Sequence, residues 1–178
     1  AYKRQLQAQT FTNFNGLRLQ GGSAEAQQSK LVVGPWPHAL SASTRTGEID
    51  FGAQSLYDLD GAEMRWFDYW LKGIDSGVMD EPPVQIFVMG RNQWRAEADW
   101  PLPDTRYANY YLRGGRSGSI DSLNDGTLSP EQPAGSENPD SFLYDPYDPV
   151  PTLGGSTLGI VSGVFDQRPV DARCLTFT

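Results

Sequence analysis

The spacing of apolar residues predicts two helices and one buried strand in the first part of the chain. Residues 1–20 carry leucine and phenylalanine at loosely helical intervals, and Gly21 supplies a stop signal. Residues 30–34 form a short β-branched run, which is typical of a strand buried on both faces in a parallel sheet. Residues 56–72 place apolar side chains mostly along one helical stripe, and Gly73 follows as the stop.

After Pro82 the helical period disappears and strand-like runs replace it. Residues 84–89 and 107–112 are dense runs of this kind. Weaker candidates are residues 141–144, 158–165 and 173–177. Long polar segments rich in Gly and Pro separate the runs, which favours a β-sandwich with large loops. The fold class predicted is therefore mixed α and β, with a domain boundary near Pro82 that divides residues 1–82 from residues 83–178.

The acidic composition argues against a nucleic-acid partner. The 178 residues include 14 Lys plus Arg against 22 Asp plus Glu, a net charge of −8, and no basic run follows a phosphate backbone. No stretch reaches the roughly 18 apolar residues of a membrane span, and no signal peptide opens the chain, so no membrane partner is expected. Cys174 has no second cysteine to pair with and is expected to be a small buried hydrophobic residue. These features leave the cellular compartment unassigned.

Two loops resemble ligand-binding motifs but lack essential residues. Residues 121–132 are similar to a calcium loop, yet Leu123 and Gln132 stand where carboxylates are needed, so a turn is the better interpretation. Residues 154–157 are glycine-rich but lack the lysine of a phosphate-binding loop. One His and one Cys are too few for an ordinary zinc site. We therefore expect no metal and no cofactor.

His38 is the main candidate for chemistry. It follows the predicted strand at residues 30–34 on a stiff loop, Gly34-Pro35-Trp36-Pro37. Open α/β sheets place their chemistry at the carboxyl ends of strands, and the histidine comes last in the α/β-hydrolase triad. Such a histidine takes the proton from the serine nucleophile and later returns it to the leaving group. The alternative is a structural histidine in the core or on the surface.

Several segments resemble one family in order along the chain. The loop ending at His38 resembles the histidine loop of the cocaine-esterase-like hydrolases, which are relatives of the X-prolyl dipeptidyl aminopeptidases and α-amino acid ester hydrolases. Residues 64–73 are similar to the helix that follows that histidine, and residues 83–90 to the entry of the family's jelly-roll domain. Further matches are Trp94, Trp100-Pro101, residues 145–155 and residues 163–167.

The resemblance implies a fold and an activity for the chain. Residues 1–82 would be the C-terminal end of an α/β-hydrolase domain, and residues 83–178 an incomplete β-sandwich of the jelly-roll, galactose-binding-like type. The enzyme would be a serine esterase, acylase or peptidase acting on a small-molecule ester or amide, with acyl or X-Pro dipeptidyl groups as candidates. Only His38 falls on a catalytic position.

The rest of the triad is absent from these residues. No Gly-x-Ser-x-Gly elbow occurs in the chain, and the resemblance places the acid before Ala1. The isolated chain is therefore expected to be inactive and to depend on the rest of a parent hydrolase chain.

A different class of function stays open at this stage. The β-rich part could be a non-catalytic β-sandwich module that binds carbohydrate or protein. Its aromatic residues could stack on such a ligand, although packing in the core is the more frequent role of such side chains. The candidates are Trp94, Trp100, Tyr107, Tyr110 and Tyr111.

Overall fold

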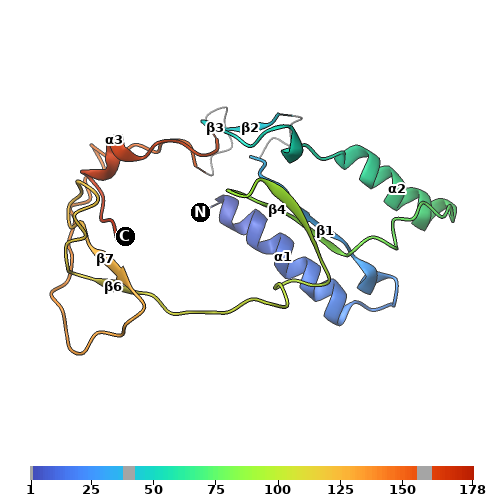
Figure 1. The fold of residues 1–178 in the computed structure, drawn as a ribbon, viewed down its shortest axis with the longest axis horizontal. Helices are drawn as coiled ribbons and strands as arrows, with labels where there is room; N and C mark the ends of the chain where they lie inside the picture. The colour runs from blue at the N-terminus through green and yellow to red at the C-terminus, as the bar shows by residue number, and fades with distance from the viewer. Residues whose placement is uncertain (1, 38–42, 156–161) are drawn as a thin grey trace. The chain divides into compact units, whose positions relative to one another are not determined.

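The computed structural model describes residues 2–37, 43–155 and 162–178. It contains helices and three small sheets, which confirms a mixed α and β fold (Figure 1). Two compact units are present: residues 1–105 with 154–164, and residues 106–153 with 165–178. Among the helices of the described residues, none is long and apolar enough to cross a membrane.

The predicted helices of the first unit are confirmed. Helix α1 spans Tyr2–Gln20, and helix α2 spans Leu59–Lys72. The side chain of Asp58 caps α2 by accepting a hydrogen bond from the amide of Gly61 at 3.0 Å. Gly73 ends α2 in the left-handed conformation with φ of 67°, which glycine adopts without a Cβ penalty.

A three-stranded sheet crosses the predicted boundary at Pro82. Its strands are β1 (Leu31–Val33), β4 (Val84–Val88) and β5 (Gln93–Glu97), in the order β1-β4-β5. The parallel pairing predicted for the first strand is confirmed, since Leu31 of β1 is in register with Val84 of β4. Strand β5 pairs antiparallel with β4, and its mostly polar sequence explains why the apolar pattern missed it.

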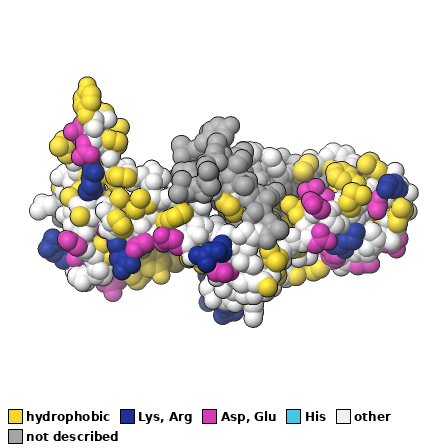
Figure 2. All heavy atoms as spheres, turned by 90° about the horizontal axis from the view of Figure 1, so that it is seen from above, with side chains coloured by type: hydrophobic (Ala, Val, Ile, Leu, Met, Phe, Trp, Pro, Cys, Tyr) yellow, Lys and Arg dark blue, Asp and Glu magenta, His cyan; other side chains and the backbone are white. Residues whose placement is uncertain are grey.

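The core of this unit joins the first helix to the sheet. Phe14 of α1, Leu31 of β1 and Val84 of β4 are all buried, and Trp100 packs against them. Figure 1 shows α1 lying along this sheet. By contrast, α2 has no buried residue, and Figure 2 shows hydrophobic side chains on the surface of this unit. The exposed side chains of α2 include Met64, Phe67 and Leu71.

Short elements complete the first unit. They are the 3₁₀ turns η1 (Ala26–Gln28) and η2 (Ala53–Ser55) and the hairpin of β2 (Arg45–Thr46) with β3 (Ile49–Asp50). The segment around Val164 joins this hairpin, because the amide of Glu48 donates to the carbonyl of Val164 at 2.8 Å.

The second unit holds one small sheet and a structured turn. Strands β6 (Tyr111–Arg113) and β7 (Thr127–Ser129) pair antiparallel, and α3 spans Arg168–Asp171. The buried Asp125 carboxylate accepts from the Ser117 hydroxyl at 2.6 Å and from the Gly118 amide at 2.8 Å. Protein donors therefore occupy the carboxylate in the segment that was compared with a calcium loop.

Several strand predictions in this part are wrong in their extent. Residues 141–144 are exposed and form no strand. A strand needs a partner, and no strand of the described residues pairs with this run. The strand predicted at 107–112 begins only at Tyr111, and residues 173–177 contribute only an isolated bridge from Phe177 to Gly126. Half of the run at 158–165, residues 158–161, lies outside the described residues.

The compact units divide after Thr105, whereas the sequence predicts a boundary near Pro82. The difference arises because β4 and β5 hydrogen-bond to the sheet that begins with β1. Assignment of residues 1–82 and 83–178 to two evolutionary domains stays a prediction.

Candidate functional site

His38 itself lies outside the described residues, but the loop that leads to it is described up to Pro37. This loop begins where β1 ends at Val33. The carbonyl of Pro35 accepts a hydrogen bond from the hydroxyl of Thr46, a buried residue of β2. The histidine loop, defined here as residues 34–37, is thus tied to the β2–β3 hairpin by a polar contact in a partly buried environment.

The backbone at Gly34 lies directly against the indole ring of Trp36. A Cβ atom on residue 34 would come within 2.3 Å of Cε2 of Trp36, far inside van der Waals contact. Glycine is therefore required for this ring position, and any other residue would displace either the ring or the backbone.

Trp36 also belongs to an aromatic cluster, defined by Trp36, Tyr57, Phe87 and Trp94. The Trp36 ring centroid is 6.1 Å from that of Tyr57 and 5.9 Å from that of Trp94. Tyr57 and Trp94 approach each other to 4.9 Å, and Phe87 meets Trp94 edge-on at 5.5 Å. These separations fall in the range in which aromatic pairs attract one another. The cluster fixes the histidine loop to β4 and β5.

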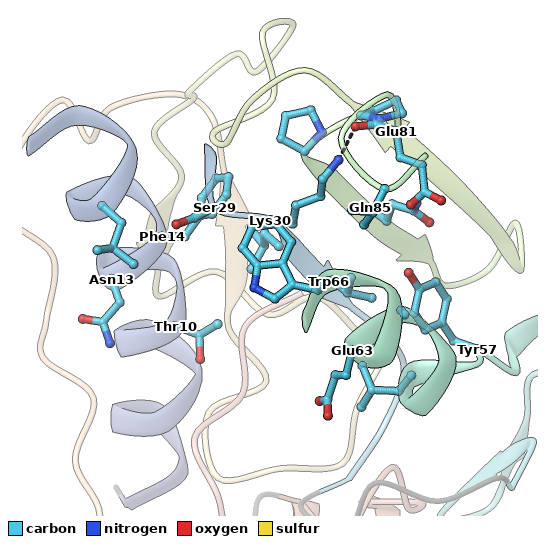
Figure 3. Close-up of a pocket in the computed structure, with 18 of the residues that line it drawn as sticks. Thr10, Asn13, Phe14, Ser29, Lys30, Tyr57, Glu63, Trp66, Glu81 and Gln85 are labelled. Atoms are coloured by element: carbon cyan, nitrogen blue, oxygen red, sulfur yellow. Dashed lines mark hydrogen bonds between the residues drawn. The ribbon is translucent and has the colours of Figure 1, made fainter. Parts of the chain in front are cut away.

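A cavity of about 580 Å³ lies in the first unit, near the residues that precede β1 and β4 (Figure 3). Its walls come from α1, α2, the residues around the start of β1 and the segment before β4. In Figure 3, Lys30 and Trp66 lie between α1 on one side and Tyr57 on the other. The histidine loop follows the carboxyl end of β1, so the cavity and the loop are distinct places. Tyr57 lines the cavity and contacts Trp36, and so links the two.

Charged groups cluster beside this cavity. The Lys30 ammonium donates to the Glu81 carbonyl, and the Arg65 guanidinium pairs with the Glu81 carboxylate. Partial burial lowers the pKa of Lys30 despite the opposing attraction of Glu81. Burial, followed by the negative charge of Glu81, raises the pKa of Tyr57. The polar groups are thus satisfied by one another and tie α2 to the segment before β4.

The described residues do not assemble a triad or a metal site. The sequence contains no Gly-x-Ser-x-Gly elbow, and the part of the chain that the structure describes has no group of three or more His, Cys, Asp or Glu side chains that could hold a metal ion. What the arrangement can do is hold the loop that precedes His38. A nucleophile and an acid would have to come from other residues.

The structure separates the aromatic residues that were considered for ligand binding. Trp94 lies in the aromatic cluster, and Trp100 stacks on Phe11. Tyr107 and Tyr110, in contrast, are 85% and 60% exposed. The two tryptophans therefore have packing roles, Tyr107 and Tyr110 are exposed, and Tyr111 on β6 is half-buried.

Sequence reasoning missed the residues that hold the histidine loop. Thr46 lies in a polar segment without a motif, and Tyr57 sits just before a helix. Trp94 is a candidate from the sequence, but its contact with Trp36 requires the pairing of β4 with β5. No local pattern in the sequence predicts the contacts of these three residues with the histidine loop.

Comparison with known proteins identifies the second part of the chain. Residues 76–178 match the family model described as the X-Pro dipeptidyl-peptidase C-terminal non-catalytic domain. This match covers more than half of the chain and confirms the resemblance drawn from the sequence.

Individual relatives extend the similarity. Cocaine esterase from Rhodococcus sp. (strain MB1 Bresler) is 42% identical over 150 residues, which cover 82% of this chain and 26% of that protein. A candidate serine esterase from Mycobacterium bovis is 31% identical over 159 residues, covering 84% and 22%. A candidate Xaa-Pro dipeptidyl-peptidase from Bacillus anthracis is 38% identical over 52 residues, covering 29% and 8%. The chain spans about a quarter of the length of the first two relatives.

Proposed function

Because this chain belongs to the family of the X-Pro dipeptidyl-peptidase C-terminal non-catalytic domain, we propose that it forms part of a serine hydrolase that cleaves ester or amide bonds. In this proposal His38 is the general acid/base. The substrate is a small molecule with a scissile acyl or X-Pro dipeptidyl bond. The remainder of the parent hydrolase is the chain's main partner and supplies the nucleophile and the acid.

The observation that carries the proposal is the extent of the similarity to cocaine esterase. The matched stretch covers 82% of the chain, which is longer than the segment from His38 to the C-terminus. The match must therefore begin before His38 and include it. The similarity therefore reaches beyond the family model, which begins at residue 76. In this proposal residues 1–82 are the C-terminal segment of an α/β-hydrolase domain and residues 83–178 are the jelly-roll portion.

The position of the histidine loop supports this assignment. It follows the carboxyl end of β1, a strand that pairs in parallel with β4, and such strand ends are where open α/β sheets place reactive groups. His38 would accept the proton of the serine hydroxyl as it attacks the carbonyl carbon. It would then donate that proton to the departing alcohol or amine.

The test is His38→Ala in the complete hydrolase chain that contains this sequence. We expect kcat to fall on the order of 10⁴-fold or more, because the serine hydroxyl is a weak nucleophile without its base. Thermal denaturation should be nearly unchanged. A variant that keeps more than about a tenth of the wild-type kcat, or that loses activity only by unfolding, would return His38 to a structural role.

The class of scissile bond is separable in the same assay. Nitrophenyl esters of short acids report esterase activity, and X-Pro nitroanilides report dipeptidyl-peptidase activity. The substrate with the higher kcat/KM identifies the bond, since discrimination between substrates is a ratio of these constants.

One observation favours a second function for the second unit, residues 106–153 with 165–178. Several aromatic side chains of this unit are exposed, with Tyr147 at 97% and Tyr107 at 85%. Exposed tyrosine rings could stack on a sugar or on an apolar partner surface, so this unit could bind carbohydrate or protein. Glycan-array binding by the chain, abolished in Tyr107→Ser or Tyr147→Ser, would support this function. An absence of binding in the wild-type chain would exclude it for the glycans tested.

A further inference from the structure

We propose that Trp94 is a positioning residue for the histidine loop, so that the part of the chain matched as non-catalytic sets the orientation of the catalytic histidine. This inference rests on the proposed function for the role of His38. Trp94 lies inside the matched segment of residues 76–178, whereas the loop lies before it. The proposal gives the matched segment a positioning part in the chemistry of the parent hydrolase, exerted through the histidine loop.

The first step is the contact between Trp94 and Trp36. Their ring centroids are 5.9 Å apart, and Tyr57 contacts both rings. Trp36 is two residues before His38, and Pro37 stands between them. Proline fixes its own φ and restricts the backbone of the residue before it, which stiffens the segment between Trp36 and His38. In this proposal, a shift of the Trp36 ring is passed along that segment to His38.

The second step is the rigidity of the element that carries Trp94. It stands on β5 in register with Phe87 of β4, and the two rings meet edge-on at 5.5 Å. Phe87 is buried and its ring also meets that of Phe51, with centroids 5.9 Å apart. A side chain held by a hydrogen-bonded ladder and a buried neighbour is a firm support for a catalytic loop.

The third step is that the remaining loop contacts also limit where Trp36 can go. The ring lies against the backbone of Gly34, and the Thr46 hydroxyl holds the Pro35 carbonyl. In addition to these contacts, Trp94 and Tyr57 are the two aromatic neighbours of the Trp36 ring among the described residues. Removal of the Trp94 ring takes away one of these two neighbours and leaves the Trp36 ring less restrained.

Trp100 provides a matched control in the same compact unit. It is also a partly buried tryptophan of the segment matched by the family model, but its ring stacks on Phe11, with centroids 4.6 Å apart. In the described residues it makes no ring contact with Trp36. Trp94→Leu and Trp100→Leu should therefore both lower stability, while only the first should disturb the histidine loop.

The kinetic test uses the complete hydrolase with Trp94→Leu, Trp94→Phe and Trp100→Leu. We expect Trp94→Leu to lower kcat by roughly 10- to 100-fold, since small displacements of a catalytic group cost rates of that order. Trp94→Phe should recover most of this loss because it retains a ring, and Trp100→Leu should leave kcat unchanged per folded molecule. Equal kcat values for Trp94→Leu and Trp100→Leu would overturn the inference.

A spectroscopic test separates this inference from the proposed function. His38 is the only histidine of the chain, so its imidazole gives a single set of ring signals in the NMR spectrum of the 178-residue protein. We expect these signals and their pH titration to change in Trp94→Leu and to stay in place in Trp100→Leu. Signals that ignore Trp94→Leu would overturn the positioning role. If the signals change but His38→Ala leaves the hydrolase active, the proposed function fails and the loop contact stands.

Discussion

Phe11 and Trp100 stack face to face, with ring centroids 4.6 Å apart and planes 17° from parallel. Phe11 lies on the first helix, and Trp100 lies within the segment that matches the C-terminal family model. Both rings pack against the core formed by Phe14, Leu31 and Val84. The stack therefore joins a residue before position 76, where the matched segment begins, to a residue within that segment. Both residues belong to the same compact unit.

Trp100→Ala should destabilise the first unit by about 2–3 kcal/mol. Removal of a large aromatic ring leaves a cavity against the core, and the cost stays below that of a fully buried tryptophan because Trp100 is partly exposed. Urea unfolding followed by circular dichroism measures the change. Tyr107→Ala serves as the control, since an 85% exposed ring should change the free energy of unfolding by less than about 0.5 kcal/mol.

Asp58→Ala should lower stability by about 1 kcal/mol through loss of the cap of α2. The Asp58 carboxylate accepts a hydrogen bond from the Gly61 amide at 3.0 Å, and alanine leaves that amide without its side-chain acceptor. Asp58→Asn retains an acceptor and should remain close to wild type in the same urea titration. Equal losses in both variants would point to charge, and not to capping, as the source of the effect.

The fold was predictable from the sequence where local periodicity coincides with packing. The helices ending before Gly21 and Gly73 and the strand at Leu31–Val33 each have a clear period and a stop signal. The strand β5 was missed because Gln93, Arg95 and Glu97 are polar and its stability comes from pairing with β4. The run at residues 141–144 has the composition of a strand, but it has no strand partner among the described residues.

The candidate site was only partly predictable for the same reason. The motif leading to His38 is local, so the sequence alone singled it out. The contacts of Trp36 with Tyr57 and Trp94 join residues far apart in the chain, and no periodic pattern encodes them. The position of His38 relative to those rings stays a prediction, because that residue lies outside the described residues.

The second unit should lose stability in acid through Asp125. Hydrogen bonds from the Ser117 hydroxyl and then from the Gly118 amide hold the pKa of this carboxyl below its ordinary value. Because the pKa is lower in the folded state, the charged carboxylate stabilises the fold. This contribution is fully present at pH values above the pKa of the unfolded chain, which is about 3.9. It disappears as the pH falls through the pKa of the folded state.

Asp125→Asn tests this dependence. Thermal unfolding of the chain between pH 6 and pH 2 should show a steeper loss below about pH 4 in the wild type than in the variant. Asp140→Asn is a suitable control, because Asp140 is an exposed carboxyl of the same unit. Parallel pH profiles for wild type and Asp125→Asn would show that the carboxylate makes no net contribution in its charged form.

The 178-residue chain alone should not hydrolyse nitrophenyl acetate above background. It has no Gly-x-Ser-x-Gly elbow, and the members of a triad act as a unit, so a histidine without its serine contributes little. Release of nitrophenolate by the purified chain and by His38→Ala is compared at equal concentration. Turnover in the wild-type chain that is lost in His38→Ala would contradict this expectation. It would mean that the chain contains a nucleophile outside a Gly-x-Ser-x-Gly motif.

Deletion of residues 1–75 should loosen β4 and β5 without affecting the second unit. Val84 is fully buried, and two residues of the deleted segment, Phe14 and Leu31, form the core with it. The deletion also removes β1, the strand that pairs in parallel with β4. We therefore expect faster hydrogen exchange at the amides of Val84–Val88 in a chain that begins at Ser76, as mass spectrometry of exchanged peptides would show.

The second unit provides the internal control for this deletion. The amide of Gly126 donates to Thr176 and that of Leu128 to Thr178, each at 2.9 Å, and neither bond involves the deleted residues. Their exchange rates should stay as they are in the complete chain. Unchanged protection of β4 in the shortened chain would mean that the matched segment folds independently, with the domain boundary near Pro82. Selective loss in β4 and β5 would mean that their folding depends on the first helix and β1, and that the independently stable unit begins after Thr105.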